Sequence, residues 1–241
     1  MADAFLLAAE QFRSARSIDG LWAILNQQLK RFGITGILYG SEAMPGRPRE
    51  ANFILNSIGA GWLSDKFAGD LFYCDEYVRV ARVDPTPVLW TSPDNLPEIT
   101  MEARRSLALD YDHGVITGVT VPMRFCDGLG GSSIGCHAAD MSFAEFAAFW
   151  NESQTDIAMI TNAFDATLRQ GFGMAMFDLT PEECSCLSYL AIGLKPKQIA
   201  ERTRRSYKQV WSMLQRAQRH LKCQTAEQAV ATALIYGLIG P

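Results

Sequence analysis

A group of cations and hydrogen-bond donors lies near the C-terminus of this 241-residue chain. Helical spacing over residues 207–222 predicts one apolar face, made of Val210, Leu214, Ala217 and Leu221. The opposite face carries donors and a flat ring: Lys208, Trp211, Ser212, Gln215 and Arg219. Such side chains suit the major groove of DNA, where base edges offer acceptors and methyl groups. Three cations just before this helix are positioned to neutralise phosphates: Lys197, Arg204 and Arg205.

The charge distribution supports a polyanionic partner for this part of the chain. Residues 178–241 hold nine basic and five acidic side chains, a net charge of +4, although the whole chain carries −4. The other residues hold 13 basic and 21 acidic side chains, a net charge of −8. An acidic body with a basic C-terminal segment is typical of nucleic-acid binding. The alternative is a small helical bundle with a solvated basic face.

Catalytic and metal-binding patterns are not found. The three histidines, His113, His137 and His220, have no nucleophile or metal partner at a suggestive spacing. Cys184 and Cys186 are two residues apart, so on a helix they point in different directions and cannot easily share a metal. The six cysteines are expected to be buried apolar residues in a reducing cytoplasm. We therefore expect neither an enzyme nor a metal site.

The C-terminal donors need short helices to position them. Capping boxes start at Thr180, Ser206 and Thr225, and Pro196 marks a further helix start. These signals predict four helices, over residues 181–192, 196–203, 207–222 and 226–237. The short connection between the second and third is what a helix-turn-helix requires. Residues 179–241 are thus expected to form an all-α, four-helix, helix-turn-helix domain.

The first 170 residues mix helical and strand patterns. Helices are expected over 2–12, 16–32, 61–69, 74–82, 98–110 and 142–169, and strands over 34–39, 52–58, 118–125 and 132–137. Asp127-Gly128 predicts a hairpin turn between the last two strands. The fold class is therefore α+β: an α-β-α sandwich with an antiparallel sheet in residues 1–170. Gly171-Phe172-Gly173-Met174 is expected to break the last helix, which makes residues 171–178 a linker.

The C-terminal segment resembles the DNA-binding domain of LuxR-type regulators over about 60 residues. The matching residues are Leu179-Thr180, Glu183, Leu187, Gly193, Ile199-Ala200, Ser206, Val210, Leu221, Ala229-Val230 and Gly237-Leu238-Ile239. The departures are Thr203 and Arg205 in place of aliphatic residues, Gln209 in place of Thr, and Met213 in place of His. They affect the packing of the turn and the DNA sequence that would be read, but not the fold.

The N-terminal part resembles the quorum-sensing branch of that family, the acyl-homoserine-lactone receptors. Trp62, Asp75, Trp90 and Gly118 match the branch pattern in one ungapped register. The resemblance implies that the Trp62 indole donates to a lactone carbonyl, that Asp75 accepts the ligand's amide N–H, and that Trp90 walls the lactone ring. A buried carboxylate without a partner is costly, so such a ligand would also stabilise the fold. The expected ligand is an acyl-homoserine lactone, with a different small molecule or no ligand as the alternative, and no cofactor is expected.

The expected ligand pocket departs from the family at three positions. Ile58 and Lys66 stand where tyrosines are usual, and Glu76 stands in place of a proline. Lys66 either extends toward solvent or pairs with Asp75 or with an acidic ligand group. An internal pair would satisfy Asp75 without any ligand, which would suit a ligand-independent regulator. Ser132 or Ser133 is a candidate for the missing donor.

These patterns predict a cytoplasmic transcriptional regulator. The resemblance implies a homodimer on a palindromic double-stranded DNA site, controlled by an autoinducer or by no ligand, and without a membrane. Candidate dimer faces are Phe146, Phe149 and Trp150 on one helix and Ala229, Ala233 and Tyr236 on another; the alternative for both is the chain's own core. The competing function is that of an orphan regulator or an anti-activator that forms heterodimers with a related regulator.

Overall fold

A computed structural model of the chain describes residues 2–43, 53–90 and 99–240. It divides into two units of separately packed structure. The first comprises residues 1–41, 53–124 and 131–165, and the second comprises residues 166–241 with segments 42–52 and 125–130. Each unit is described below by itself.

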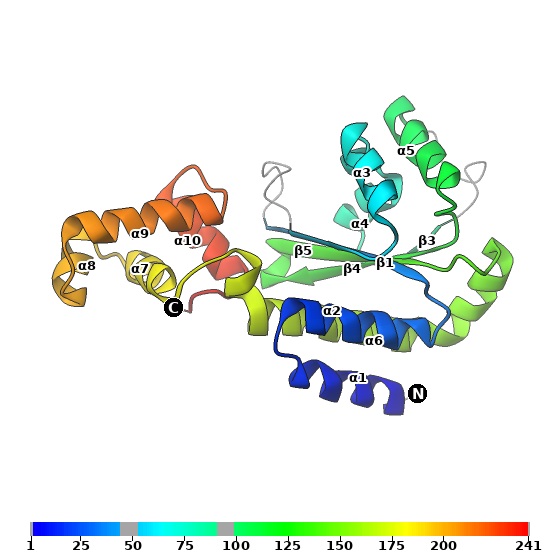
Figure 1. Cartoon of the computed structure of the whole chain (residues 1–241), viewed down its shortest axis with the longest axis horizontal. Helices are drawn as coiled ribbons and strands as arrows, with labels where there is room; N and C mark the ends of the chain where they lie inside the picture. The colour runs from blue at the N-terminus through cyan, green and yellow to red at the C-terminus, as the bar shows by residue number, and fades with distance from the viewer. Residues whose placement is uncertain (1, 44–52, 91–98, 241) are drawn as a thin grey trace. The chain divides into compact units, whose positions relative to one another are not determined.

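The first unit is built on one five-stranded sheet (Figure 1). Its strands are β1 (Gly36–Ala43), β2 (Phe53–Asn56), β3 (Val88–Leu89), β4 (Gly118–Phe125) and β5 (Gly130–His137), in the order β2-β1-β5-β4-β3. β1 pairs antiparallel with β2 through Tyr39 opposite Leu55, and β3 with β4 through Leu89 opposite Val119. The antiparallel sheet is confirmed, and the short β3 is a strand that the sequence patterns did not predict.

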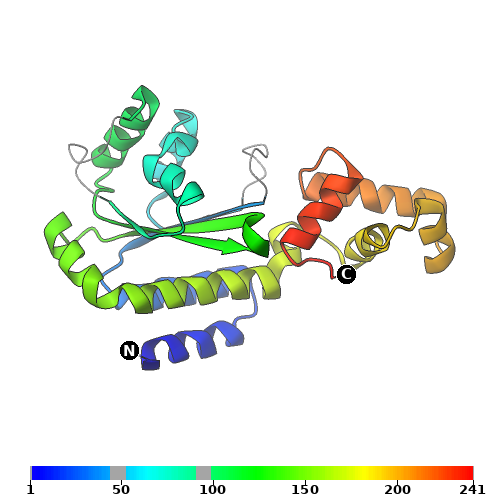
Figure 2. The ribbon, with the colours of Figure 1, turned by 180° about the vertical axis from the view of Figure 1, so that it is seen from behind.

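Helices cover both faces of this sheet. α3 (Ala60–Ala68), α4 (Glu76–Val83) and α5 (Met101–Asp112) lie over one face, and α2 (Ile18–Lys30) and α6 (Phe143–Met176) over the other, with α1 (Ala2–Ser14) outside α2 (Figures 1 and 2). The described residues also contain two short 3-10 turns, η2 (Phe72–Cys74) and η4 (Cys126–Gly128). The predicted α-β-α arrangement and the turn at Asp127-Gly128 are confirmed.

Strand β5 shows how the two faces differ. Its side chains alternate, as in any strand: Ser132, Ile134 and Cys136 are buried, whereas Ser133 and Gly135 are half-buried. The Ser132 hydroxyl lies 2.5 Å from Asp165 of α6, so the buried set faces α2 and α6. Gly135 lies against the Trp90 ring, so the other set faces α3–α5.

Helix α6 differs from the prediction. It runs without interruption from Phe143 to Met176, through the glycines that were expected to end it. A glycine inside a helix costs only about 1 kcal/mol relative to alanine, and packing overrides such a cost. A Cβ atom on Gly173 would come within 2.5 Å of a Leu238 methyl group, so this glycine allows close packing at the end of the helix. The expected linker over residues 171–178 is therefore mostly helical.

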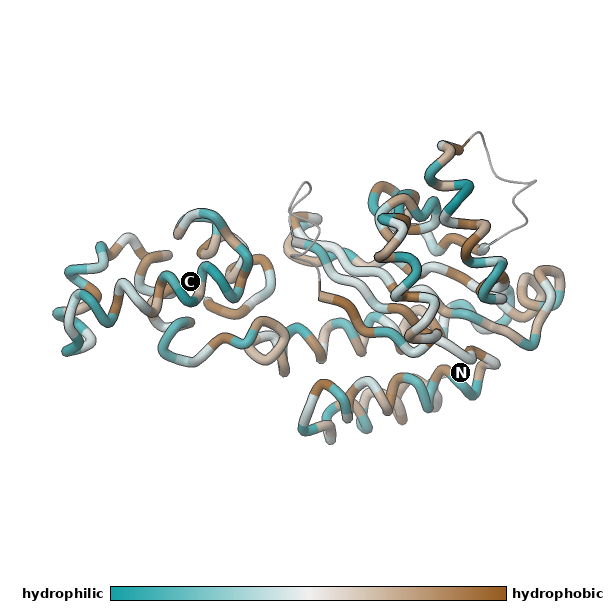
Figure 3. The backbone as a smooth tube through the Cα atoms, turned by 45° about the horizontal axis from the view of Figure 1, so that its top comes forward, coloured by the Kyte–Doolittle hydropathy of each residue, from teal (hydrophilic) through white to brown (hydrophobic). Residues whose placement is uncertain are grey.

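The second unit contains four short helices, close to the predicted ranges. They are α7 (Pro181–Ala191), α8 (Pro196–Thr203), α9 (Tyr207–His220) and α10 (Ala226–Ile235). Thr180, Ser206 and Thr225 each accept a backbone N–H from three residues on. The complete capping box forms at Thr180 and Ser206 but not at Thr225, because the Gln228 side chain accepts from the Gln224 N–H instead. Colours for hydrophilic and hydrophobic residues alternate along the helices (Figure 3), as expected where each helix buries one face.

Most of the candidate dimer residues belong to the chain's own core. Phe146 and Trp150 of α6 are buried, and so are Ala229, Ala233 and Tyr236 at α10. The Tyr236 ring packs against Phe177, with centroids 4.8 Å apart. The alternative of an intramolecular core therefore holds for these five residues. Within the described residues, no helix combines the length and apolar character needed to cross a membrane.

Candidate functional site

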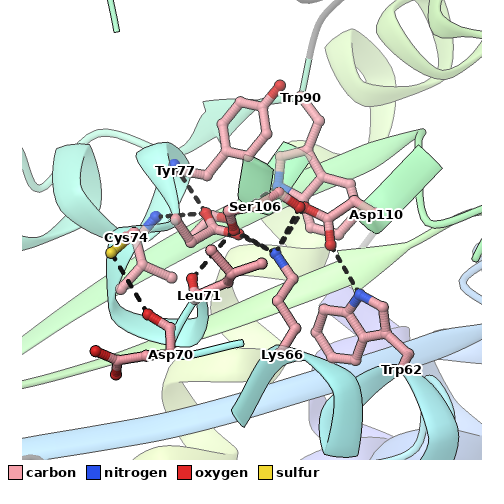
Figure 4. A network of polar contacts seen from close by, with 12 residues as sticks. Trp62, Lys66, Asp70, Leu71, Cys74, Tyr77, Trp90, Ser106 and Asp110 are labelled. Carbon is pink, nitrogen blue, oxygen red and sulfur yellow. Dashed lines mark hydrogen bonds and ion pairs between the residues drawn. The ribbon is translucent and has the colours of Figure 1, made fainter. Parts of the chain in front are cut away.

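Two helices of the first unit face each other with matching pairs of polar residues. Trp62 and Lys66 are one turn apart on α3, and Ser106 and Asp110 are one turn apart on α5. The Trp62 indole N–H donates to Asp110 Oδ1 at 2.7 Å, and Lys66 Nζ donates to Asp110 Oδ2 at 2.8 Å. One carboxylate thus binds both α3 side chains. Figure 4 shows this polar cluster, which we define as Trp62, Lys66, Asp75, Ser106 and Asp110.

The ammonium group of Lys66 is the centre of the cluster. Its side chain is only 1% exposed. Besides Asp110, Nζ lies 2.6 Å from Ser106 Oγ, 3.2 Å from the Ser106 carbonyl oxygen and 3.3 Å from Asp75 Oδ2. Four oxygens thus surround a group that has three N–H bonds to donate. The Ser106 hydroxyl in turn donates to the Leu71 carbonyl at 3.1 Å. Lys66 therefore does not extend toward solvent.

Asp75 closes the cluster from the N-terminus of α4. It is the N-cap of that helix, and Oδ1 accepts the backbone N–H groups of Tyr77 at 3.0 Å and Val78 at 3.2 Å. Its other oxygen accepts from Lys66, an ion pair between side chains that are 1% and 16% exposed. A carboxylate at a helix N-terminus is favoured by the helix dipole and by the unsatisfied N–H groups there. Both oxygens of Asp75 are therefore used within the protein.

Burial, together with the negative charge of Asp75, raises the pKa of Asp110 from its ordinary 3.8 to about 7. The Lys66 ammonium and the Trp62 N–H act in the opposite direction, because both stabilise the ionised carboxylate. Burial has the larger effect. The carboxyl of Asp110 consequently exchanges its proton near neutral pH, unlike an exposed aspartate.

Trp90 forms an aromatic layer beside the polar cluster. Its ring stacks on Tyr77 and on His137, with centroid distances of 5.9 and 6.2 Å, and its N–H donates to Thr120 Oγ1 at 2.9 Å. The ring lies on Gly118, where a Cβ atom would come within 2.9 Å of it and 2.1 Å of the Cys136 carbonyl oxygen. The spacing between Trp90 and Gly118 therefore has a steric cause. Burial of the His137 imidazole lowers its pKa, which favours the neutral form of this ring.

Two of the expected ligand-binding residues lie away from the cluster. Ile58 is half-buried beside Gly36, where a Cβ atom would meet the Ile58 Cα at 2.9 Å. Ser132 donates to Asp165 on the opposite face of the sheet, so it does not supply the donor expected of it. The reason is that successive side chains of a strand point to opposite faces of the sheet. Ser132 is on the face covered by α2 and α6, and Ser133 is on the face covered by α3–α5. Glu76, in place of the family proline, is buried and pairs with Arg79 at 2.6 Å.

The sequence patterns did not predict Ser106 and Asp110 as site residues. Their signal is the buried stripe of α5, which reads Ala103, Ser106, Leu107 and Asp110. Two polar residues at core positions of one helix imply a partner that satisfies them. No motif names that partner in advance, because Lys66 is 40 and 44 residues away from these two in the chain.

The second candidate surface is the exposed face of α9. Lys208, Trp211, Ser212, Gln215 and Arg219 are all exposed, while Val210, Leu214, Ala217 and Leu221 are buried. Lys197, Arg204 and Arg205, which precede this helix in the chain, are exposed as well. The predicted division of the helix into a packed and an open face is thus present.

The connection between α8 and α9 forms a tight turn despite its unusual residues. Arg204 has φ 54° and ends α8 in the left-handed conformation, and Thr203 Oγ1 donates to the Ile199 carbonyl at 2.7 Å. Behind α9, the buried Glu183 of α7 accepts from Arg216 Nε at 2.7 Å. The contact between Arg216 and Glu183 joins α9 to α7. Over the described residues, no group of three or more potential ligands is arranged to hold a metal ion.

Comparison with known proteins agrees with these observations. The autoinducer binding domain family matches residues 17–168, a range that contains the whole polar cluster. Solved structures with the same fold include Escherichia coli SdiA, with 16% identity and a TM-score of 0.58, where the match covers 96% of this chain and 95% of that chain. SdiA in complex with octanoyl-rac-glycerol matches with 14% identity and a TM-score of 0.59, over 97% of this chain and 94% of that chain.

A third structure is that of CepR2 from Burkholderia cenocepacia, described as an N-acylhomoserine-lactone-dependent LuxR-family transcription factor. It matches with 13% identity and a TM-score of 0.57, over 69% of this chain and 94% of that chain. A search of curated proteins gives no match. At these identities the structures show the common fold, whereas the family match covers most of the chain. This chain therefore belongs to the autoinducer-binding domain family of LuxR-type quorum-sensing regulators, whose members are ligand-binding transcription regulators and not enzymes.

Proposed function

We propose that this protein is a DNA-binding transcriptional regulator in which residues 179–241, part of the second unit, form a helix-turn-helix domain. α9 would lie in the major groove, where Lys208, Trp211, Ser212 and Gln215 reach base edges. Lys197, Arg204 and Arg205 would contact phosphates. The regulator would act in the cytoplasm as a homodimer on a palindromic site, since two-fold symmetry of the protein requires two-fold symmetry of the DNA.

The observation that carries this proposal is the pair of faces on α9. Four apolar residues pack inward, while the donors on the other side are open to solvent. A helix in a closed bundle gains nothing from exposing a tryptophan, yet the side chain of Trp211 is 49% exposed. It stacks on Tyr207, with centroids 6.4 Å apart, which holds the ring at the surface. A surface that contacts the base edges in a DNA groove, as proposed, explains this arrangement.

The test is selection of DNA fragments that the full chain binds from a random pool, followed by affinity measurements on the selected site. Lys208→Ala and Gln215→Ala are each expected to weaken specific binding by about 1–3 kcal/mol if each reads a base. The matched control is Gln27→Ala, because Gln27 is an exposed glutamine on α2 of the other unit. Equal losses on selected and random DNA would mean that the two residues contact phosphates only.

The signal for such a regulator would be a small autoinducer, an acyl-homoserine lactone or a related molecule, bound beside the polar cluster by Trp62, Asp75 and Trp90. A second candidate is a regulator that needs no ligand, and a specific observation favours it: Lys66 already pairs with Asp75. An anti-activator that acts by heterodimerisation has less support. It rested on Thr203 and Arg205, and the turn that contains them is well formed.

A further inference from the structure

We infer that Lys66 and Asp110 together replace the polar head group of a ligand, so that the sensor unit is complete without a lactone and rejects one. This inference rests on the proposed function, because it decides between the two candidate signals given above. It names Lys66 and Asp110 as the residues that determine ligand specificity. The argument depends on which hydrogen bonds of the cluster are already made.

The first step concerns the donor expected to bind a lactone carbonyl. The Trp62 N–H points at a carboxylate oxygen of Asp110, at 2.7 Å. The same carboxyl also accepts from Lys66 Nζ at 2.8 Å, so it is held in place by both α3 side chains. A lactone or amide carbonyl is neutral and would have to displace Asp110 to reach the indole. Displacement would also leave a buried carboxylate with one partner fewer, which adds a desolvation cost.

The second step concerns the acceptor expected to bind the ligand's amide N–H. Asp75 Oδ1 is held by two backbone N–H groups, and Oδ2 by the Lys66 ammonium at 3.3 Å. An amide N–H would have to compete with a positively charged donor whose side chain is almost completely buried. The cluster thus offers the ligand neither the donor nor the acceptor that the family pattern assigns to it.

The third step concerns the stability of the unit without ligand. Receptors that leave polar groups for a ligand carry unsatisfied buried groups when empty, and binding then stabilises the folded state. Here Lys66 supplies the donors from within the chain, and it bridges α3, α5 and the start of α4. These three helices cover one face of the sheet. The internal ion pairs therefore connect the helices that a ligand head group would connect in a receptor with a free pocket.

The test uses the full-length chain and three probes, N-hexanoyl-, N-octanoyl- and N-dodecanoyl-homoserine lactone. Thermal unfolding and native mass spectrometry of the wild type are expected to show neither a melting shift nor a bound lactone. The double variant Lys66→Tyr/Asp110→Leu frees the Trp62 N–H and Asp75 Oδ2. It is expected to melt at a lower temperature than the wild type and to regain stability when a lactone is added. The control Ser64→Tyr/Asp112→Leu places the same side chains at exposed positions of the same helices, and no lactone response is expected from it.

A rise in the wild-type melting temperature with any of the three lactones would overturn the inference. A double variant that folds, but whose melting temperature does not change when a lactone is added, would also overturn it. If the double variant does not fold, the mass spectra of the wild type decide, and a bound lactone would overturn the inference. DNA binding is scored separately. Specific DNA binding by the wild type without lactone agrees with both proposals. If no condition gives specific DNA binding, the proposed function is rejected. The inference about Lys66 and Asp110 is then tested by the lactone measurements alone.

Discussion

The side chain of Lys66 is 1% exposed, although lysine is almost never fully buried without a partner. Removing one member of a buried ion pair is strongly destabilising, because it leaves a charge without compensation. In this protein the ammonium separates two carboxylates, Asp75 and Asp110, that repel each other. The energetic role of Lys66 therefore lies less in attraction to either carboxylate than in allowing the two to lie close together.

The raised pKa of Asp110 predicts a specific dependence of stability on pH. Between the ordinary pKa of 3.8 and the folded value of about 7, the folded protein keeps a proton on this carboxyl that the unfolded chain has lost. The contribution of Asp110 to the free energy of unfolding therefore falls as pH rises through this window. Asp110→Asn cannot lose that proton, so its stability relative to wild type should rise with pH across the same window.

Urea unfolding at several pH values measures this difference. Asp112→Asn, an exposed change on the same helix, should show a flat difference, and an equally flat result for Asp110→Asn would contradict the prediction.

Gly118 permits a second prediction about single residues. Alanine at this position would place a Cβ atom 2.1 Å from the Cys136 carbonyl oxygen and 2.9 Å from the Trp90 ring. Because one of these obstacles is backbone, relief requires a shift of the sheet or of the indole, and overpacking of this kind costs about 1–3 kcal/mol. Chemical unfolding should show this loss for Gly118→Ala. At Gly61 on α3 a Cβ atom meets nothing within 4 Å, so Gly61→Ala should cause no comparable loss; equal effects would argue against the steric explanation.

At the scale of elements, each unit is organised by one polar residue that joins helices. In the first unit Asp110 ties α5 to α3. In the second unit Glu183 of α7 is fully buried, accepts the Thr180 backbone N–H at 3.0 Å within its own capping box, and accepts Arg216 of α9. The same carboxylate therefore caps the start of one helix and binds a side chain of another. The hydroxyl of Ser212 on the open face of α9 also accepts from Arg216, at 3.1 Å.

The start of α9 provides a prediction at this scale. Ser206 accepts the Gln209 N–H at 3.2 Å, and the Gln209 side chain accepts the Ser206 N–H at 2.8 Å. Ser206→Ala removes the first of these bonds and should cost about 0.5–2 kcal/mol of stability. Ser185→Ala is the matched control, since that hydroxyl bonds a carbonyl inside α7 at 2.9 Å and caps nothing. Denaturant unfolding compares the two, and a larger loss for Ser185→Ala would contradict the capping argument.

The whole molecule combines an acidic first part with a basic C-terminal segment. The net charge of −4 alone would oppose binding to a polyanion, but all nine cations of residues 178–241 lie between Lys195 and Lys222. Salt screens charges beyond about 8 Å at physiological ionic strength, so the proposed contacts with DNA would depend mainly on charges closer than this to the phosphates. The distribution of charge, rather than its sum, supports the proposed DNA partner.

This distribution predicts the salt dependence of DNA binding. The logarithm of the binding constant falls with the logarithm of salt concentration, with a slope of about 0.9 for each phosphate contact. Arg205→Ala should therefore lower the slope by about 0.9 per subunit, or about twice that for a dimer on its site. Lys30→Ala, which removes an exposed cation of the other unit, should leave the slope unchanged. An unchanged slope for Arg205→Ala would remove this residue from the proposed phosphate contacts.

Local sequence signals determined most of the architecture. Capping boxes, apolar periodicity and turn residues predicted the four C-terminal helices and the antiparallel sheet between helices, because these signals act over a few residues. The pattern of Trp62, Asp75, Trp90 and Gly118 indicated the family, which the match over residues 17–168 confirms. Local signals failed at Gly171 and Gly173, where tertiary packing keeps α6 helical.

Only the tertiary structure decided which groups satisfy one another. Lys66 was compatible with a solvated position or an internal pair, and the sequence gives no preference between them, since Ser106 and Asp110 lie on a helix 40 or more residues away. Packing α3 against α5 buries all three polar side chains at once, and burial makes their mutual hydrogen bonds obligatory. Strand alternation likewise turned Ser132 away from the cluster. Hydrogen bonding between distant segments depends on the relative position of whole elements, and no local spacing encodes that position.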